Sequence, residues 1–246
     1  GKYYRLPKLP YIPGTDGAGV VISSNSDKFK IGDRVWYYSH PEITEVENKI
    51  ENKLQNESEN KVEVEEECTG AYADQIILPD YLVRYLPDYY NFYQGATLGL
   101  AYCTGQLVLN NLNKVNLDNT KSNPKTLLLI GATGGVGIAI LQLLKNNTSY
   151  KIIAPYHNEA AKLFLESLGN IALFDSRKDD WTHQVRNYLH KNNQTMDFIV
   201  DLHANQHLKD DFFIADKHTK ILVVGCRGNL PEDISGRPII EKMLEI

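Results

Sequence analysis

Four glycines occur within seven positions near the middle of the 246-residue chain, in the run Gly131-Ala132-Thr133-Gly134-Gly135-Val136-Gly137. They follow Leu127-Leu128-Leu129-Ile130, an apolar run typical of a central parallel strand, and they open an apolar stretch of helical type. Small residues between a strand and a helix let a pyrophosphate approach the backbone, where the free N–H groups of the helix attract its charge. The run therefore predicts a dinucleotide site. It departs from G-x-G-x-x-G because Ala132 stands at the first glycine position, and taken alone it could be only a tight turn.

The residues after the next strand indicate which dinucleotide would bind. An NAD site usually has an acidic residue about 20 positions further on, where it holds the ribose 2′-hydroxyl. Here the strand ends in Ala154-Pro155-Tyr156-His157 without an acid, which favours NADPH because a carboxylate would repel a 2′-phosphate. Candidate ligands of that phosphate are His157, Lys162 and Arg177, with Glu159 as an opposing charge. Lys162 and Arg177 could equally be ordinary surface charges.

Strand-like and helix-like segments alternate from about residue 99 to 246. Strands are expected at 127–130, 152–154, 171–174, 198–201 and 220–225. Helices are expected over 136–144, from the N-cap residue Asn158 to Gly169, and around 181–189. This alternation predicts an α/β fold with a Rossmann-type doubly wound parallel sheet.

Residues 1–98 have a different pattern, with short strand-like runs separated by Gly and Pro. Strands are expected near 19–22, before Trp36, at 71–78 and at 82–86, which predicts a small barrel or sandwich. Residues 41–67 interrupt this pattern with ten Glu and three Lys. We expect a mobile acidic insertion there, since it offers little apolar surface to bury; an acidic binding segment is the alternative.

Several further runs resemble zeta-crystallin-type quinone oxidoreductases of the zinc-independent medium-chain dehydrogenase/reductase superfamily. They are Pro10–Val20, Phe29–Val35, Gly70–Asp74, Gly95–Thr104, Asp201–Asn205 and Val223–Gly228. The resemblance covers most of the chain except the acidic insertion. It implies a partial GroES-like catalytic domain over residues 1–98 and a Rossmann NADPH-binding domain over 99–246 that is incomplete at its C-terminus.

The resemblance also implies roles for single residues. The pyrophosphate turn would be Gly134, Gly135, Val136 and Gly137, while His157 and Ser176 would flank the adenosine ribose and its phosphate. Thr104 and Asn205 would orient cofactor and substrate near the nicotinamide. The loops beside the nicotinamide ribose would also include Leu222, Val223, Val224 and Gly225.

No metal is expected. The resemblance to zinc alcohol dehydrogenases would require Gly-His-Glu where this chain has Gly14-Thr15-Asp16, and three scattered cysteines cannot form a four-cysteine zinc site. The odd number of cysteines indicates a reducing, cytoplasmic location. Thr126–Leu144 is uncharged and long enough to cross a bilayer, but its four glycines favour a strand followed by a helix.

The expected function is NADPH-dependent reduction of a quinone, with no metal and with the substrate between the two domains. An enone or alkenal is the alternative substrate on the same scaffold. A non-catalytic NADPH- or RNA-binding paralogue, or a degenerate chain, is the alternative outside catalysis. The net charge of −5 does not favour RNA, and the resemblance implies a homo-oligomer that does not bind membranes.

Overall fold

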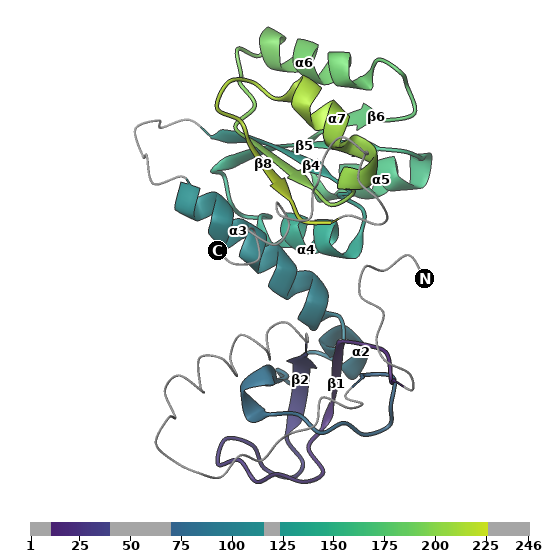
Figure 1. Ribbon diagram of the computed structural model, residues 1–246, viewed down its shortest axis with the longest axis vertical. Coiled ribbons are helices and arrows are strands. Elements are labelled where there is room, and N and C mark those ends of the chain that lie inside the picture. Colours follow the sequence, from purple (N-terminus) through teal and green to yellow (C-terminus); the bar gives the residue numbers. More distant parts are fainter. Residues whose placement is uncertain (1–10, 40–69, 116–123, 226–246) are drawn as a thin grey trace. The chain divides into compact units, whose positions relative to one another are not determined.

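The computed structural model describes residues 11–39, 70–115 and 124–225 (Figure 1). The chain divides into two compact units, with the boundary between Cys103 and Thr104. The acidic insertion expected over 41–67, and everything after Gly225, lie outside the described residues.

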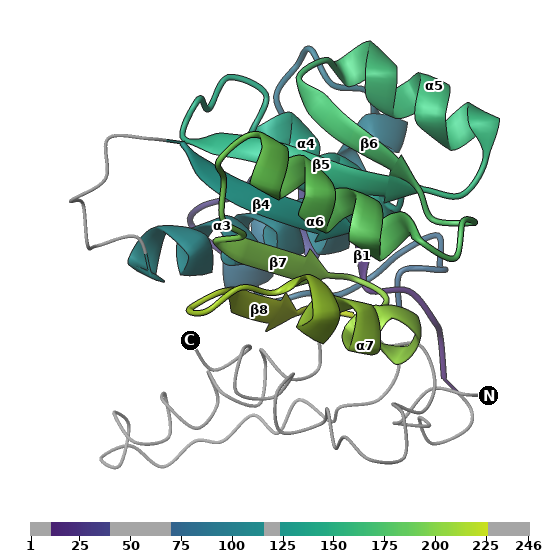
Figure 2. The ribbon, with the colours of Figure 1, turned by 90° about the horizontal axis from the view of Figure 1, so that it is seen from above.

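The unit that begins at Thr104 is built around a five-stranded parallel sheet of order β6-β5-β4-β7-β8 (Figure 2). The chain enters at the central strand, moves outward through two strands, and then returns to the other side of the central strand. Ligands of doubly wound sheets bind where the strand order reverses in this way, here between β4 and β7. The strands are β4 (Lys125–Ile130), β5 (Tyr150–Tyr156), β6 (Ile171–Asp175), β7 (Phe198–Asp201) and β8 (Lys220–Val223).

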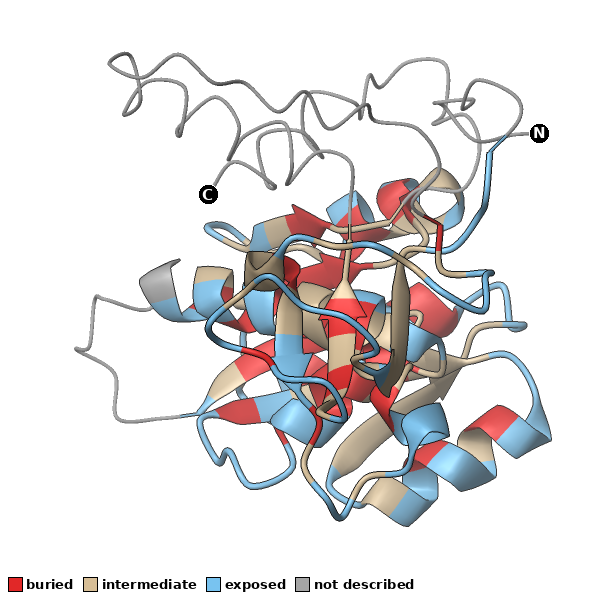
Figure 3. Cartoon of the chain, turned by 90° about the horizontal axis from the view of Figure 1, so that it is seen from below, coloured by how far each residue is buried: buried red, intermediate tan, exposed pale blue. Residues whose placement is uncertain are grey.

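Helices cover both faces of this sheet, so β4 is buried on both sides (Figure 3). Leu127 and Leu129 pack with α3 (Cys103–Val115), α4 (Gly135–Leu143) and α5 (Glu159–Leu168). Leu128 and Ile130 pack on the opposite face with α6 (Trp181–Lys191) and the end of α7 (Ala204–Ile214). The alternation of β4 side chains between two cores is what a central strand requires, and it confirms the predicted doubly wound sheet.

The span from Thr126 to Leu144 is the strand β4, a glycine turn and the helix α4. Within the described parts of the chain, no helix is long and apolar enough to cross a membrane.

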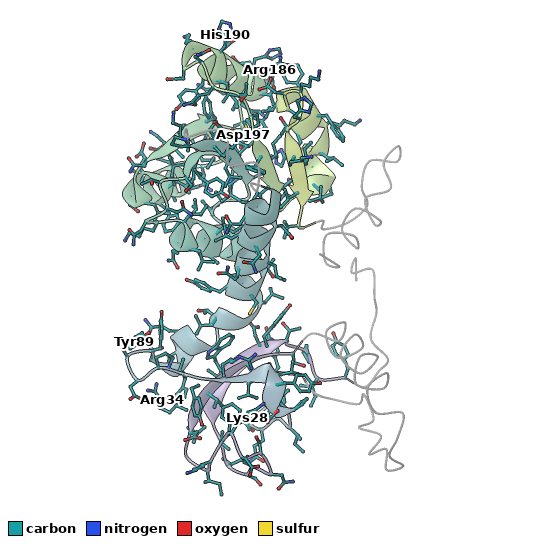
Figure 4. All side chains as sticks on the ribbon, turned by 90° about the vertical axis from the view of Figure 1, so that its left-hand side faces the viewer. Lys28, Arg34, Tyr89, Arg186, His190 and Asp197 are labelled. Atoms are coloured by element: carbon teal, nitrogen blue, oxygen red, sulfur yellow. The ribbon has the colours of Figure 1, made fainter. Side chains whose placement is uncertain are left out.

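The unit that ends at Cys103 holds a three-stranded antiparallel sheet of order β1-β2-β3. Arg34 (labelled in Figure 4) connects this sheet to the helix that begins at Phe92. Its guanidinium donates to the carbonyls of Asp88 and Tyr90 and lies over the ring of Phe92. The elements of the unit are β1 (Asp16–Val20), β2 (Arg34–Tyr38), the 3₁₀ turn η1 (Asp80–Leu82), β3 (Val83–Tyr85), α2 (Phe92–Gly95) and the π-helical turn η2 (Leu98–Tyr102).

The strand expected over residues 71–78 is not formed, and that prediction was wrong. The N–H groups of Ala71 and Tyr72 donate to the carbonyls of Gly14 and Pro13, so a bend at residues 71–74 is bonded to a distant segment and no strand ladder follows it. The side chains of Tyr72 and Ile77 are 80% and 89% exposed. A strand with no buried face gains little from pairing.

Candidate functional site

The predicted cofactor loops of the larger unit all follow strands of one parallel sheet, so they meet at the same edge. In the order of the strands, Ser176 and Arg177 follow β6, His157 follows β5, and the glycine turn follows β4. Asn205 then lies in the first turn of α7, after β7, while Val224 and Gly225 follow β8. Residues from five separate parts of the sequence therefore lie along one edge of the sheet, at the carboxyl ends of its strands.

The glycine turn is open to solvent at its tip and tightly closed at its base. Gly134 and Gly135 are exposed, whereas Gly137 is buried. A Cβ at Gly137 would lie 2.3 Å from the carbonyl oxygen of Gly131, so only glycine permits this approach of helix to turn. Gly131 itself has φ of +81°, a left-handed conformation that favours glycine.

The start of α4 offers hydrogen-bond donors to an anion. Gly134 is the N-cap and supplies no capping side chain, and the first bond of the helix runs from the N–H of Ile138 to the carbonyl of Gly134. The N–H groups of Gly135, Val136 and Gly137 therefore precede the helix's own hydrogen bonds. Donors at an exposed helix start, with no side chain in the way, fit a pyrophosphate.

The residues predicted near the adenosine ribose gather around Tyr156, the last residue of β5. The N–H and Oγ of Ser176 both donate to the carbonyl of Tyr156, at 2.8 and 2.9 Å. The pKa of Lys162 is raised chiefly by Glu159 and that of Arg177 chiefly by Asp175, with a smaller contribution from Tyr156 to each. His157 is exposed, with its Nε2 atom 3.0 Å from Nδ2 of Asn158.

Both cations of this group are paired with acids. The Lys162 Nζ atom lies 3.4 Å from Glu159 and 3.7 Å from Glu166, and these carboxylates raise the pKa of the ammonium. Arg177 binds the two carboxylate oxygens of Asp175, and its hydrogen bonds lower the pKa of that carboxyl to about 2. The group thus contains two cations and three carboxylates, of which Asp175 and Glu159 bear directly on any 2′-phosphate.

The loops after β4, β7 and β8 are joined through Asp201, the last residue of β7. Its carbonyl accepts from the N–H groups of Val224 and Gly225, and its Oδ1 atom accepts from the N–H of His203 at 2.6 Å. The N–H of Ala204 returns a bond to the carbonyl of Gly225. The first turn of α7, which carries Asn205, is therefore fixed against the end of β8.

Thr104 is the second residue of α3, and the structure places it beside α4 through its neighbour. A Cβ at Gly105 would meet Leu143, Ala139 and Ile140 at 3.4 to 3.5 Å, which is close helix packing. Leu222 and Val223, predicted near the nicotinamide ribose, are buried core residues of β8. The roles of Thr104, Asn205 and β8 toward a nicotinamide stay predictions.

Two features of this edge were not predicted from the sequence. Tyr156 is the centre of the group near the ribose, and Asp201 and Asp211 are carboxyl side chains with 0% exposure. A signal for Asp211 was present, since Ala204, Leu208 and Asp211 recur at the spacing of a buried helix face. Among the described residues, no group of three or more His, Cys, Asp or Glu could hold a metal ion.

Comparisons with known proteins agree with this architecture. Residues 1–88 match the family model of the alcohol dehydrogenase GroES-like domain. A quinone oxidoreductase of Mus musculus is 28% identical over 249 aligned residues, which cover 100% of this chain and 64% of that protein. The chain therefore spans less than two thirds of the mouse relative.

Two solved structures share the fold. A quinone oxidoreductase of Pseudomonas syringae pv. Tomato gives a TM-score of 0.70 at 21% identity, covering 98% of this chain and 63% of that one. An Escherichia coli quinone oxidoreductase complexed with NADPH gives 0.67 at 19% identity, with the same coverages.

The GroES-like match over residues 1–88 and the parallel sheet are the two parts that the sequence motifs predicted. The chain is similar to quinone oxidoreductases, in agreement with the resemblance drawn from those motifs.

Proposed function

We propose that this chain binds NADPH along the β6-β5-β4-β7-β8 edge and belongs to an enzyme that reduces quinones. The observation that carries the proposal is the glycine turn at the strand-order reversal. Its tip is exposed, its base admits no side chain at Gly137, and three N–H groups at the start of α4 are available to an anion. These are the features that a pyrophosphate needs.

The preference for NADPH over NADH is supported by the charges near Tyr156. Lys162 and Arg177 come from different elements and lie near the same side chain, where a 2′-phosphate would follow β5. The acids Glu159 and Asp175 are both paired with these cations, so neither is an uncompensated carboxylate that would select a 2′-hydroxyl.

When bound, the nicotinamide supplies the hydride that reduces the acceptor. The chain's own residues would bind and orient the cofactor: the start of α4 would hold the pyrophosphate, and Lys162 and Arg177 would hold the 2′-phosphate. Asn205 and the end of β8 would orient the nicotinamide ribose, with Thr104 as a candidate hydroxyl for the ring. We take the acceptor to be a quinone because the mouse relative is a quinone oxidoreductase.

Cofactor titration of wild-type protein and of Gly134→Asp tests the proposal. Gly134 has φ of −78° and its Cβ would lie 3.3 Å from the carbonyl of Gly131, so a side chain fits there once that carbonyl shifts by a few tenths of an ångström. Aspartate is also a good N-cap, hence α4 should stay folded while its start becomes negatively charged. Gly134→Ala is the matched control, since it adds a side chain with no charge and no capping oxygen.

We expect tight NADPH binding, weaker NADH binding, loss of both in Gly134→Asp and retention in Gly134→Ala. NADPH binding that is equal in wild type and Gly134→Asp would refute the site. Turnover of a quinone compared with an α,β-unsaturated carbonyl then identifies the acceptor, and a preference for the second would replace the quinone with an enone.

A further inference from the structure

Two carboxyl side chains are completely buried at the end of β7. Asp201 is the last residue of that strand and Asp211 lies in α7, and both are 0% exposed. Only Oδ1 of Asp201 has a hydrogen-bond donor, the N–H of His203 at 2.6 Å. Oδ2 of Asp201 and both oxygens of Asp211 have no donor among the described groups if both carboxyls are ionised.

One bound proton would supply a donor to this pair of buried carboxyls. Two ionised carboxylates can only accept hydrogen bonds, and burying both charges together is strongly unfavourable. The two side chains lie within hydrogen-bonding range of each other, so a proton on Asp211 provides a donor to Asp201. Burial, and to a smaller extent the charge of Asp201, together raise the pKa of Asp211 to about 9.

Few charged groups face the pair. His203 precedes α7, while His207 and Asp210 lie on it and bind each other at 3.2 Å. His183 and Arg186 of α6 instead face Phe213 on α7 (Arg186 is labelled in Figure 4). The lysines of the neighbouring strands, Lys125 of β4 and Lys220 of β8, lie at the opposite end of β7, next to Asp197 and Phe198.

The pair lies where three cofactor loops meet. Asp201 receives hydrogen bonds from His203, Val224 and Gly225. The N–H of Leu202 donates to the carbonyl of Ile130 at the end of β4. The packing is too tight for side chains at two glycines: a Cβ at Gly131 would lie 2.7 Å from the ring of His203, and one at Gly225 would lie 2.5 Å from the carbonyl of Leu202. A shift of Asp201 would therefore displace the loops after β4, β7 and β8 together.

We propose that Asp201 and Asp211 share a single proton and that the protonated pair positions these three loops for dinucleotide binding. Both are positioning residues, because they act through the backbone and not on the cofactor. The part that concerns binding rests on the proposed function, whereas the shared proton does not.

The shared proton is tested without cofactor, by urea unfolding of wild type, Asp211→Asn and the control Asp210→Asn between pH 4 and 10. The folded wild type keeps the proton up to about pH 9, while unfolded Asp loses it near its ordinary value of 3.8. Folded wild type should therefore lose about tenfold in its folding equilibrium constant for each pH unit between these values, relative to Asp211→Asn. Asparagine donates the same hydrogen bond without titrating, and Asp210→Asn should keep the wild-type slope.

If the folding equilibrium constant of Asp211→Asn falls with pH as steeply as that of wild type, the proposal of a shared proton is wrong. If Asp211→Asn does not fold, the carboxyl stretching bands of wild type in the infrared, followed against pH, decide the same question. A protonated carboxyl band that persists to about pH 9 supports the pair, and its absence at pH 7 overturns it.

The positioning role is tested by NADPH titration at pH 7 and pH 10, with circular dichroism to confirm that the protein is folded. Wild type should bind about tenfold more weakly at pH 10, because only about a tenth of the molecules keep the proton. Asp211→Asn should bind equally at both pH values, and Asp211→Ala should bind weakly at both. Equal pH dependence in wild type and Asp211→Asn would refute the role, whereas no NADPH binding by wild type at pH 7 would refute the proposed function and leave the unfolding test valid.

Discussion

The guanidinium of Arg177 donates two parallel hydrogen bonds to the carboxylate of Asp175, from Nε to Oδ1 at 2.8 Å and from Nη2 to Oδ2 at 2.7 Å. Asp175 ends β6 and pairs in register with Tyr156 at the end of β5. The arginine thus covers the acid that lies nearest to the expected 2′-phosphate, and it remains 56% exposed. Its charge can serve a phosphate and a carboxylate together, since a guanidinium has five donors.

We expect Arg177→Ala to weaken NADPH binding about tenfold or more and NADH binding little, because the variant loses a phosphate ligand and exposes a repelling carboxylate. Titration with both cofactors measures this. The double variant Arg177→Ala with Asp175→Asn is the control, and it should recover part of the loss. An equal loss for NADH and NADPH would show that Arg177 supports the fold instead.

Lys162 offers a second test of the same charges from another element. Its Nζ atom is shared between Glu159 and Glu166, so part of its charge is already neutralised. Glu159→Gln should free the ammonium and strengthen NADPH binding severalfold, an effect that added salt reduces. Glu166→Gln, two turns further along α5, removes the more distant partner of Lys162 at 3.7 Å and should strengthen NADPH binding less. Unchanged affinity in Glu159→Gln would mean that Lys162 does not reach the phosphate.

The sequence predicted the parallel sheet well because its strands are buried on both faces. Residues 127–130 and 198–200 are apolar without alternation, and they lie in the central strands β4 and β7. The helix α5 was also predicted with its ends, since Asn158 caps it through the N–H of Ala161 and Gly169 ends it at φ of 72°. Such local signals need no tertiary information.

What the sequence did not predict depends on contacts between distant residues. The apolar residues of 71–78 resemble those of a strand, yet the segment starts with a bend whose N–H groups donate to Gly14 and Pro13. The proton shared by Asp201 and Asp211 needs the end of β7 to meet a helix that begins three residues later. Similarly, the sequence shows Arg177 and Asp175 only as two nearby charges. The pairing of β6 with β5 is what brings both next to Tyr156, where the 2′-phosphate is expected.

The base of the glycine turn gives a prediction about stability. Gly137→Ala would place a Cβ 2.3 Å from the carbonyl oxygen of Gly131, against backbone that cannot move aside easily. We expect a loss of about 1–3 kcal/mol in the free energy of unfolding, measured by urea titration, together with weaker cofactor binding. In Gly134→Ala the Cβ would lie 3.3 Å from the carbonyl oxygen of Gly131, so the loss of stability should be much smaller. Similar losses in both variants would contradict the close approach of α4.

The opposite end of the sheet should affect stability without affecting the cofactor. Asp197, just before β7, accepts from the buried N–H of Thr126 at 2.9 Å and pairs with Lys125 at 3.2 Å (Figure 4). Asp197→Ala leaves that N–H without its acceptor, so we expect a loss of about 1–3 kcal/mol in the free energy of unfolding. Asp197→Asn keeps an acceptor oxygen and should lose less. Because β7 carries Asp201 at its other end, NADPH affinity of the folded Asp197→Ala protein should equal that of wild type. Reduced affinity there would mean that strain passes along β7 to the cofactor loops.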